Sequence, residues 1–386
     1  MRKKILFSAS IFHAVNDAAT VTIPMLFPLL YSKQIIIHNY SMIGVLSNLG
    51  LLMTFVFQML VGGNSHKFEY RHMVLISILG ISFSIFAITF CSSFISLLFL
   101  YLIMRISASI YHPLGISMVS RFHPGEYLDT AIGIQGGSGN LGVFLAFLST
   151  GYLAQKFGWK IPLYIWGAVI FLVGSISFFL VRKISSRLDQ GITLNFSAWK
   201  KSFSYLVPHI PGLIFGGACW ATTIYFAPSL FTHRFALDLG TTGLFLAIWI
   251  GLGTTMTYIF GWLSRKLGRA KLTMGSYTLS SVFLLLLGVS SSKALALAVF
   301  FLYGALLFLI FPAIQSSLGE TTPTAFQTLA FSLLANVLML TGAFFSLLSG
   351  ILADHFGINT PFLCLAVLGI VISFFSLKHY RNNSLN

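Results

Sequence analysis

Apolar stretches of about twenty residues recur along the whole chain, each separated from the next by a short polar segment. A stretch of this length can cross the hydrocarbon core of a bilayer as a helix. Alternating strands of about ten residues, which would predict a β-barrel, are not seen. The pattern therefore predicts an all-α membrane protein with twelve transmembrane helices, at residues 5–31, 41–62, 72–90, 94–120, 129–155, 161–182, 202–231, 240–263, 271–291, 294–319, 325–352 and 360–378.

The composition supports a membrane protein. Of the 386 residues, 56% are hydrophobic and 8% are charged, and the mean hydropathy is +0.89. A soluble domain has roughly 25% charged residues, so lipid must be the outer solvent. The basic start at Arg2 resembles a signal peptide, but the apolar run is too long and no small-residue cleavage site closes it. The three cysteines lie within or at the edge of spans and predict no disulfide framework.

The net charge of +15 is distributed unevenly along the chain. If the N-terminus is inside, most of the 23 Lys and Arg residues fall in the inner segments. This asymmetry predicts that both termini of a multi-pass protein lie in the cytoplasm, with the chain in the cell membrane. The basic charge thus orients the protein and contacts lipid, and it does not call for a nucleic-acid partner.

The second half of the chain repeats the first at an offset of 199 residues. Gly62 corresponds to Gly261, Pro113 to Pro312, and residues 151–158 to residues 350–357. The offset spans six helices, so the two repeats have the same orientation. The expected domains are a six-helix bundle at 1–182, a cytoplasmic linker at 183–201 and a second bundle at 202–386. Parallel repeats of this kind bind solutes near the midplane and rock against each other, which predicts transport.

The segment after the eighth span, Gly261 to Arg269, resembles the Gly-x-Leu-Ala-Asp-Arg-x-Gly-Arg-Arg motif of the major facilitator superfamily. The corresponding segment from Gly62 to Arg71 is degenerate. The resemblance implies a monomeric secondary transporter that needs no cofactor and is not an enzyme. It also implies gating loops with Lys67, Arg71, Lys266 and Arg269, which we expect to pair with Glu126, Asp129 and Glu320 because the motif's own Asp is replaced.

Short motifs in the first half resemble the fosmidomycin-resistance branch of efflux proteins. They are Phe12 to Asp17, Phe27 to Leu30, Tyr111 to Pro113 and Gly139 to Gly142. One feature departs from the antiporters of the superfamily, which often carry a Gly-Pro pair late in the fifth helix. Here Val143 follows Gly142, and this leaves the direction of transport open.

Asp17 is the one acidic residue well inside a span, where a carboxylate costs roughly 2.5–3.5 kcal/mol on the insertion scale. It is a candidate proton-binding switch, or else a buried Asp bonded to neighbours such as Asn16. Arg105 is the one basic residue deep in a span, and is a candidate counter-ion for Asp17, an anchor for an anionic substrate, or a snorkelling side chain. His112 and His13 are candidate proton carriers or helix-bridging side chains.

Several polar and aromatic residues within the spans are candidates for contact with substrate. They would suit an amphipathic, partly apolar solute, although packing explains each of them as well. The glycines between Gly133 and Gly142 predict close helix packing. The substrate candidates are His13, Asn16, Gln135, Asn140, Trp220, Tyr225, Trp249, Tyr303, Gln315 and Asn336.

The sequence has no metal-ligand spacing, nucleophile motif or nucleotide loop. Transport that is active should therefore use an ion gradient. The leading hypothesis is a proton-coupled exporter of small organic molecules. The alternative is an uptake symporter or exchanger for a small organic anion, and a non-transporting sensor would require a soluble domain that the sequence does not contain.

Overall fold

A computed structural model describes residues 2–63, 69–123, 128–184 and 196–383. Within this part the helices are joined by short connections. In the first half the helices are α1 (Arg2–Ser32), α2 (Tyr40–Gly63), α3 (Tyr70–Ile88), α4 (Phe94–Ser109), α5 (Tyr111–Phe122), α6 (Leu128–Phe157) and α7 (Lys160–Val181). The second half has α8 (Phe196–Leu206), η3 (Val207–His209), α9 (Ile210–Ser229), η4 (Leu230–Arg234), α10 (Leu239–Leu267), α11 (Arg269–Val289), α12 (Lys293–Thr321), α13 (Thr324–Phe356) and α14 (Thr360–Asn383).

The predicted all-α architecture with twelve transmembrane helices is confirmed. Ten of the described helical segments are long and apolar enough to cross a membrane, when α4 with α5 and α8 through η4 are each taken as one span. The long α1 and the apolar part of α14, Thr360–Phe374, complete the twelve. The predicted spans match these helices to within a few residues at most ends.

The break between α4 and α5 has a local cause. Pro113 lacks an N–H, and its ring clashes with the carbonyl of the residue four positions earlier, which is Ser109. Helix α4 ends at Ser109, and α5 begins at Tyr111. Ile110 between them keeps helical backbone angles, so α4 and α5 form one span, and α5 carries Tyr111 and His112 into the site described below.

The chain forms two compact units. The first contains residues 1–194 and 237–247, and the second contains residues 195–236 and 248–386. The start of α10 belongs to the first unit because it packs on α6, where the Gln155 side chain accepts from the Gly240 N–H at 2.7 Å. Of the predicted linker at 183–201, residues 185–195 lie outside the described residues, and the part from Phe196 onward is helix α8.

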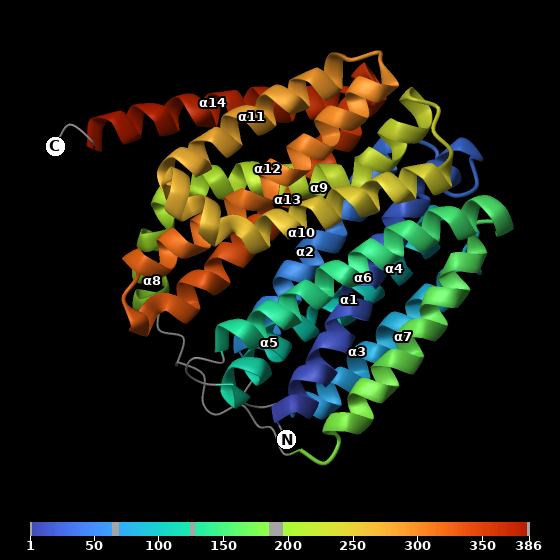
Figure 1. The fold of residues 1–386 in the computed structure, drawn as a ribbon. Helices are drawn as coiled ribbons and strands as arrows, with labels where there is room; N and C mark the ends of the chain where they lie inside the picture. The colour runs from blue at the N-terminus through green and yellow to red at the C-terminus, as the bar shows by residue number, and fades with distance from the viewer. Residues whose placement is uncertain (1, 64–68, 124–127, 185–195, 384–386) are drawn as a thin grey trace. The chain divides into compact units, whose positions relative to one another are not determined.

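Helix α1 is the centre of the first unit. It runs alongside α6 and α7 (Figure 1) and also contacts α5. Ser8 on α1 bonds the Ser177 side chain on α7 at 2.7 Å. Gly142 on α6 lies so close to α1 that a Cβ atom there would be 1.8 Å from the Ala14 carbonyl oxygen. The close packing of α1 on α6 at this point therefore requires glycine at position 142.

The second unit repeats this arrangement around α9. Helix α9 packs mainly on α13, as α1 packs on α6, and α11 pairs with α12 and α14, as α3 pairs with α4 and α7. Gly217 on α9 approaches the Leu338 backbone of α13, and Thr222 bonds the Ser349 hydroxyl at 3.0 Å. The pairing of helices thus follows the sequence repeat.

Candidate functional site

The Asp17 carboxylate is held by side chains from two helices. His13 lies one turn earlier on α1, a spacing that places both side chains on one face, and its Nε2 is 3.1 Å from Asp17 Oδ2. His112, near the start of α5, places its Nε2 3.3 Å from Oδ1. Asn16 Nδ2 donates to the same Oδ1 at 3.2 Å. Both oxygens of the carboxylate are therefore engaged within the first unit.

Helix α6 covers this cluster through a glycine. A Cβ atom at Gly139 would lie 2.7 Å from both Asp17 Oδ2 and His13 Nε2, so any larger residue would enter the contact between them. His13 is buried, while the Asp17 side chain is 21% exposed and that of His112 is 34% exposed. The cluster is thus shielded on the His13 side and open on the His112 side.

The hydrogen bond made by Nδ1 of His13 determines whether a proton lies between His13 Nε2 and the Asp17 carboxylate. His13 Nδ1 is 2.7 Å from the Gln135 carbonyl oxygen. A carbonyl oxygen only accepts, so Nδ1 carries a hydrogen and a neutral ring would have a bare lone pair at Nε2. A lone pair and a carboxylate oxygen repel each other at 3.1 Å. The contact therefore requires one additional proton, held either as imidazolium beside carboxylate or as neutral imidazole beside carboxylic acid.

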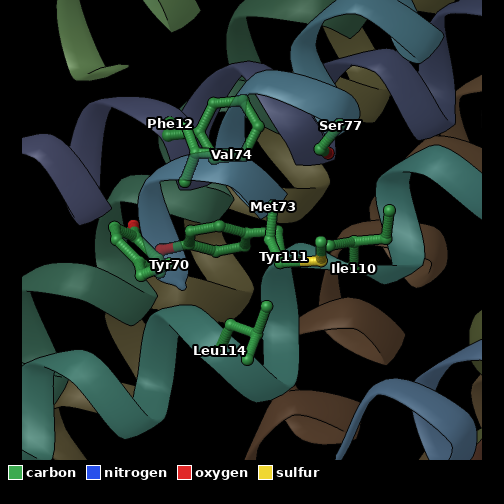
Figure 2. Close-up of a pocket in the computed structure, with 8 residues that line it drawn as sticks. All are labelled: Phe12, Tyr70, Met73, Val74, Ser77, Ile110, Tyr111 and Leu114. Atoms are coloured by element: carbon green, nitrogen blue, oxygen red, sulfur yellow. The ribbon is translucent and has the colours of Figure 1, made fainter. Parts of the chain in front are cut away.

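A chain of hydrogen bonds fixes the backbone that accepts from His13. The Gln135 side chain donates to the Tyr111 hydroxyl at 2.9 Å, and that hydroxyl donates to the Ala9 carbonyl at 2.6 Å. These bonds connect α6, α5 and α1. Figure 2 shows the Tyr111 ring in a narrow apolar pocket with Phe12 and Leu114. Sequence reasoning missed Tyr111 as a supporting residue, although it stands next to His112 in the quoted motif.

The comparisons with known proteins agree with this architecture. The family model of the Major Facilitator Superfamily matches residues 6–346. The chain belongs to the Major Facilitator Superfamily. It is therefore a secondary transporter and not an enzyme, as the sequence predicted.

Individual relatives of the superfamily are distant. The MFS-type transporter YuxJ of Bacillus subtilis (strain 168) is 24% identical over 347 residues, which cover 84% of each chain. The nitrite extrusion protein of the same organism is 24% identical over 234 residues, covering 58% of this chain and 57% of that protein.

Solved transporter structures share the fold over nearly the whole chain. A bacterial homolog of the human lysosomal transporter Spinster, inward-facing and unoccupied, has a TM-score of 0.82 at 14% identity, with 98% of this chain and 97% of that chain covered. The nucleoside transporter NupG has a TM-score of 0.78 at 13% identity, with 98% of each chain covered. These likenesses establish the superfamily fold for this chain.

Arg105 lies against a different helix from the one that carries Asp17. Its Nε donates to the Thr54 hydroxyl on α2 at 3.1 Å and approaches the Gly50 carbonyl at 3.5 Å. Of the lysine and arginine residues that the structure describes, Arg105 alone is buried. We predicted that Arg105 is a counter-ion to Asp17 or an anchor for an anion. In the structure, the ion-pair contacts of Asp17 are with His13 and His112.

The aromatic candidates of the second unit pack largely on one another. Trp220 lies 5.8 Å from Trp249 between ring centroids, and both rings contact Phe308. Tyr303 is buried and bonds the Thr223 hydroxyl at 3.0 Å. Trp249 is also buried, whereas Trp220 is half-buried and offers the accessible face of the group.

The remaining substrate candidates differ in exposure. Tyr225 and Asn336 are buried, Asn140 is half-buried and Gln315 is exposed. The glycine run on α6 is also divided. Gly139 and Gly142 contact α1 as predicted, but Cβ atoms at Gly133 and Gly136 would meet no described atom within 4 Å.

Three of the four loop cations, Arg71, Lys266 and Arg269, have contacts within their own unit. Arg269 forms a two-pronged pair with Glu320, at 2.5 and 2.6 Å, as expected from the sequence. Arg71 Nε contacts Glu69 at 2.6 Å, and Lys266 lies 5.1 Å from the Trp262 ring centroid. Lys67 and Glu126 lie outside the described residues, as does the side chain of Asp129.

The Asp17 cluster also has the donor atoms of a metal site. Single ligand atoms from His13, Asp17 and His112 all lie within 4.8 Å of one another. Two imidazole nitrogens and a carboxylate oxygen suit a divalent transition metal. Sequence spacing did not indicate this because His112 reaches the other two from a separate helix.

Proposed function

We propose that the protein is a proton-coupled exporter of a small organic solute, working by alternating access as a drug/proton antiporter. The observation that supports this most is the contact between His13 and Asp17, which requires a proton between two acceptors. In this proposal the protein sits in the cell membrane as a monomer with both termini in the cytoplasm, and its partners are protons, substrate and lipid.

The proposed coupling uses the two sides of the Asp17 carboxylate differently. Oδ2 shares the proton with the buried His13, while Oδ1 faces the more exposed His112. A solute that bonds Oδ1, or that displaces His112, changes the electrostatic environment in which the proton is held. Because a ligand shifts an equilibrium only through different affinities for its two states, a solute that binds best without the proton drives its release.

The position of the quoted motifs supports assignment to the fosmidomycin-resistance branch. Three of the four motifs meet at one carboxylate: the first contributes His13, Asn16 and Asp17, the third contributes His112, and the fourth contributes Gly139. Motifs that are far apart in sequence thus share one site. This is the arrangement that proton coupling at Asp17 would require.

Arg105 supports a second candidate, an uptake symporter or exchanger for a small organic anion. A buried guanidinium within a span is suited to hold a carboxylate or phosphate. One relative of the chain is named for extrusion of an anion, nitrite. In this candidate Arg105 is the substrate anchor and the Asp17 cluster carries the coupling ion.

The test uses inside-out membrane vesicles with an acid interior and a pH-sensitive dye. Fosmidomycin, hydrophobic cations and small organic acids are added in turn to vesicles that contain the wild type, Asp17→Asn, or Asp354→Asn as a control at an exposed carboxylate. Antiport predicts that a solute releases protons from the wild type and the control but not from Asp17→Asn. Proton release that is equal in all three would overturn the proposal, and uptake of an organic acid that fails in Arg105→Gln would favour the second candidate.

A further inference from the structure

A cationic pocket lies at one end of the first unit, away from the Asp17 cluster. The start of α1 contributes Lys4, and the residues that follow α7 contribute Arg182 and Lys183. Together with Phe179, Leu180 and Ile184 they line a cavity of about 350 Å³. The pocket is therefore cationic on one side and apolar on the other. Lys4, Arg182 and Lys183 all lie on the side of the membrane that the charge asymmetry predicts to be cytoplasmic.

Among the described residues, no carboxylate neutralises the positive charge of this pocket. Within the described part of the chain, no carboxylate pairs with Lys4, Arg182 or Lys183. The carboxylate of Glu69 is paired with Arg71, whose Nη1 donates to the Arg182 carbonyl at 2.9 Å. Basic residues at a helix C-terminus favour its dipole and orient the chain. Those roles explain the charge, but they do not explain a cavity.

The local geometry fixes Arg182 at the rim. Its guanidinium carbon lies 4.9 Å from the centroid of the Phe179 ring, which holds the planar group against an aromatic face. The bond from Arg71 fixes the backbone of the same residue. An anion that enters the cavity thus meets one oriented guanidinium and two flexible ammonium groups.

The apolar wall continues along α7. Phe179, Ile176 and Leu172 are 58%, 53% and 61% exposed. Their spacing of three and four residues places them on one face of the helix. This exposed stripe extends from the cavity toward the middle of the span, and in a bilayer it faces the acyl chains.

We propose that this pocket binds the headgroup of an anionic phospholipid. The phosphate lies among Lys4, Arg182 and Lys183, and an acyl chain follows the stripe on α7. Anionic lipids attract basic residues at the cytoplasmic surface, and each such residue contributes roughly a fivefold gain in binding. A free phosphate ion would use the cations but not the apolar wall, which is why the lipid is the occupant that fits.

A bound headgroup would connect α7 to α1, the helix that carries the proton site. Lys4 stands on α1, the helix that carries His13 and Asp17, and Arg182 caps α7, which packs on α1 through Ser8 and Ser177. A phosphate bridging Lys4 and Arg182 therefore links the start of α1 to the end of α7. The lipid site is independent of the proposed substrate and does not require the export proposal to be correct.

The experiment is native mass spectrometry of the purified protein with phosphatidylglycerol or phosphatidylcholine. The wild type is compared with the double variant Lys4→Gln/Lys183→Gln and with the charge-preserving variant Lys4→Arg/Lys183→Arg. The matched control is Lys156→Gln/Lys160→Gln at the opposite end of the α6–α7 pair, where Lys160 also lies over an aromatic ring. Size-exclusion profiles verify that each variant is folded.

We expect the wild type to retain phosphatidylglycerol over phosphatidylcholine, and the Gln double variant to lose roughly 25-fold in affinity, fivefold per cation. The Arg variant and the matched control should bind as the wild type does. Equal retention in the Gln double variant and the wild type would overturn the proposal. Displacement of phosphatidylglycerol by millimolar inorganic phosphate would also overturn it, because the pocket would then be a site for free anions.

Discussion

His13 donates its Nδ1 hydrogen to the carbonyl oxygen of Gln135 at 2.7 Å. The imidazole therefore turns its other nitrogen toward Asp17 with no hydrogen of its own unless a further proton is bound. Gln135 is in turn fixed through its side chain by Tyr111, which bonds to α1. A backbone carbonyl on α6 thus governs the protonation of a histidine–carboxylate pair on α1.

Loss of His13 should uncouple transport more strongly than loss of His112. His13 is buried and holds the proton in the proposed coupling, whereas His112 is more exposed and contacts the other carboxylate oxygen at 3.3 Å. We expect solute-driven proton release to fall by about tenfold or more in His13→Gln, since positioned proton transfer contributes factors of about 10²–10⁴. The effect of His112→Gln should be smaller. Measured rates in the opposite order would contradict the assignment of the proton to His13.

Gly139→Ala should impair proton coupling without unfolding the protein. The added methyl group would stand 2.7 Å from both Asp17 Oδ2 and His13 Nε2, and side chains can shift to avoid it. The matched control is Gly136→Ala on the same helix, where the new atom would meet nothing within 4 Å. Proton release should fall in the first variant and stay near the wild-type level in the second. Equal activity in the two variants would show that the contact tolerates displacement.

Gly142→Ala should destabilise the first unit. Its methyl group would lie 1.8 Å from the Ala14 carbonyl oxygen, which is backbone and cannot rotate away. Overpacking of this kind typically costs about 1–3 kcal/mol. Thermal unfolding in detergent measures this as a lower Tm, with Gly133→Ala as a control at an open position. An unchanged Tm in Gly142→Ala would mean that α1 and α6 separate easily.

Transport should require the attraction between the opposite charges of Arg269 and Glu320. Both side chains are partly exposed, and the guanidinium binds both carboxylate oxygens. We expect Glu320→Gln to slow transport and the exchange Arg269→Glu/Glu320→Arg to recover part of the rate. Transport assays at low and high salt provide the readout, because exposed pairs are screened by salt. If the exchange variant transports no faster than Glu320→Gln, the attraction between the two side chains is not what supports transport.

Asp238 should contribute to stability in a pH-dependent way. The Thr241 hydroxyl and N–H bond its carboxylate at 2.6 and 2.8 Å and lower the pKa of Asp238 below its usual value. A lowered pKa in the folded protein gives stability that is present above the unfolded pKa of about 3.9 and is lost as pH falls through the folded value.

Because Asn also caps helices well, Asp238→Asn should keep most of the stability at neutral pH, while Asp238→Ala should lose about 1 kcal/mol. Tm measured from pH 3 to pH 7 tests this. The difference between the wild type and Asp238→Asn should shrink toward the acid end. A difference that grows on acidification would contradict the sign of the shift.

The helical spans and the sequence repeat could be predicted from the chain because both depend on local composition. Twenty apolar residues specify a span wherever they occur, and the glycines and prolines at a fixed offset mark equivalent helices. The break at Ser109 also follows from Pro113 and elementary sterics, although the sequence interpretation gave that span as unbroken.

The site could be predicted only in part. The spacing of four between His13 and Asp17 is visible in the sequence and places them on one face, yet Arg105 was the partner suggested first. Whether Arg105 or His112 reaches Asp17 depends on how α4 and α5 pack against the other helices, and this packing is not encoded locally. Similarly, Gly136 and Gly139 look alike in sequence, and only the neighbouring helix distinguishes them.

The most direct test of the central claim is the number of protons released when solute binds to the purified protein. A pH electrode in weakly buffered detergent solution measures this for a solute identified in the vesicle assay. The account predicts release of about one proton per wild-type molecule and none from Asp17→Asn or His13→Gln, with Asp354→Asn as the control. Release of the same number of protons from wild type and Asp17→Asn would contradict a proton held between His13 and Asp17.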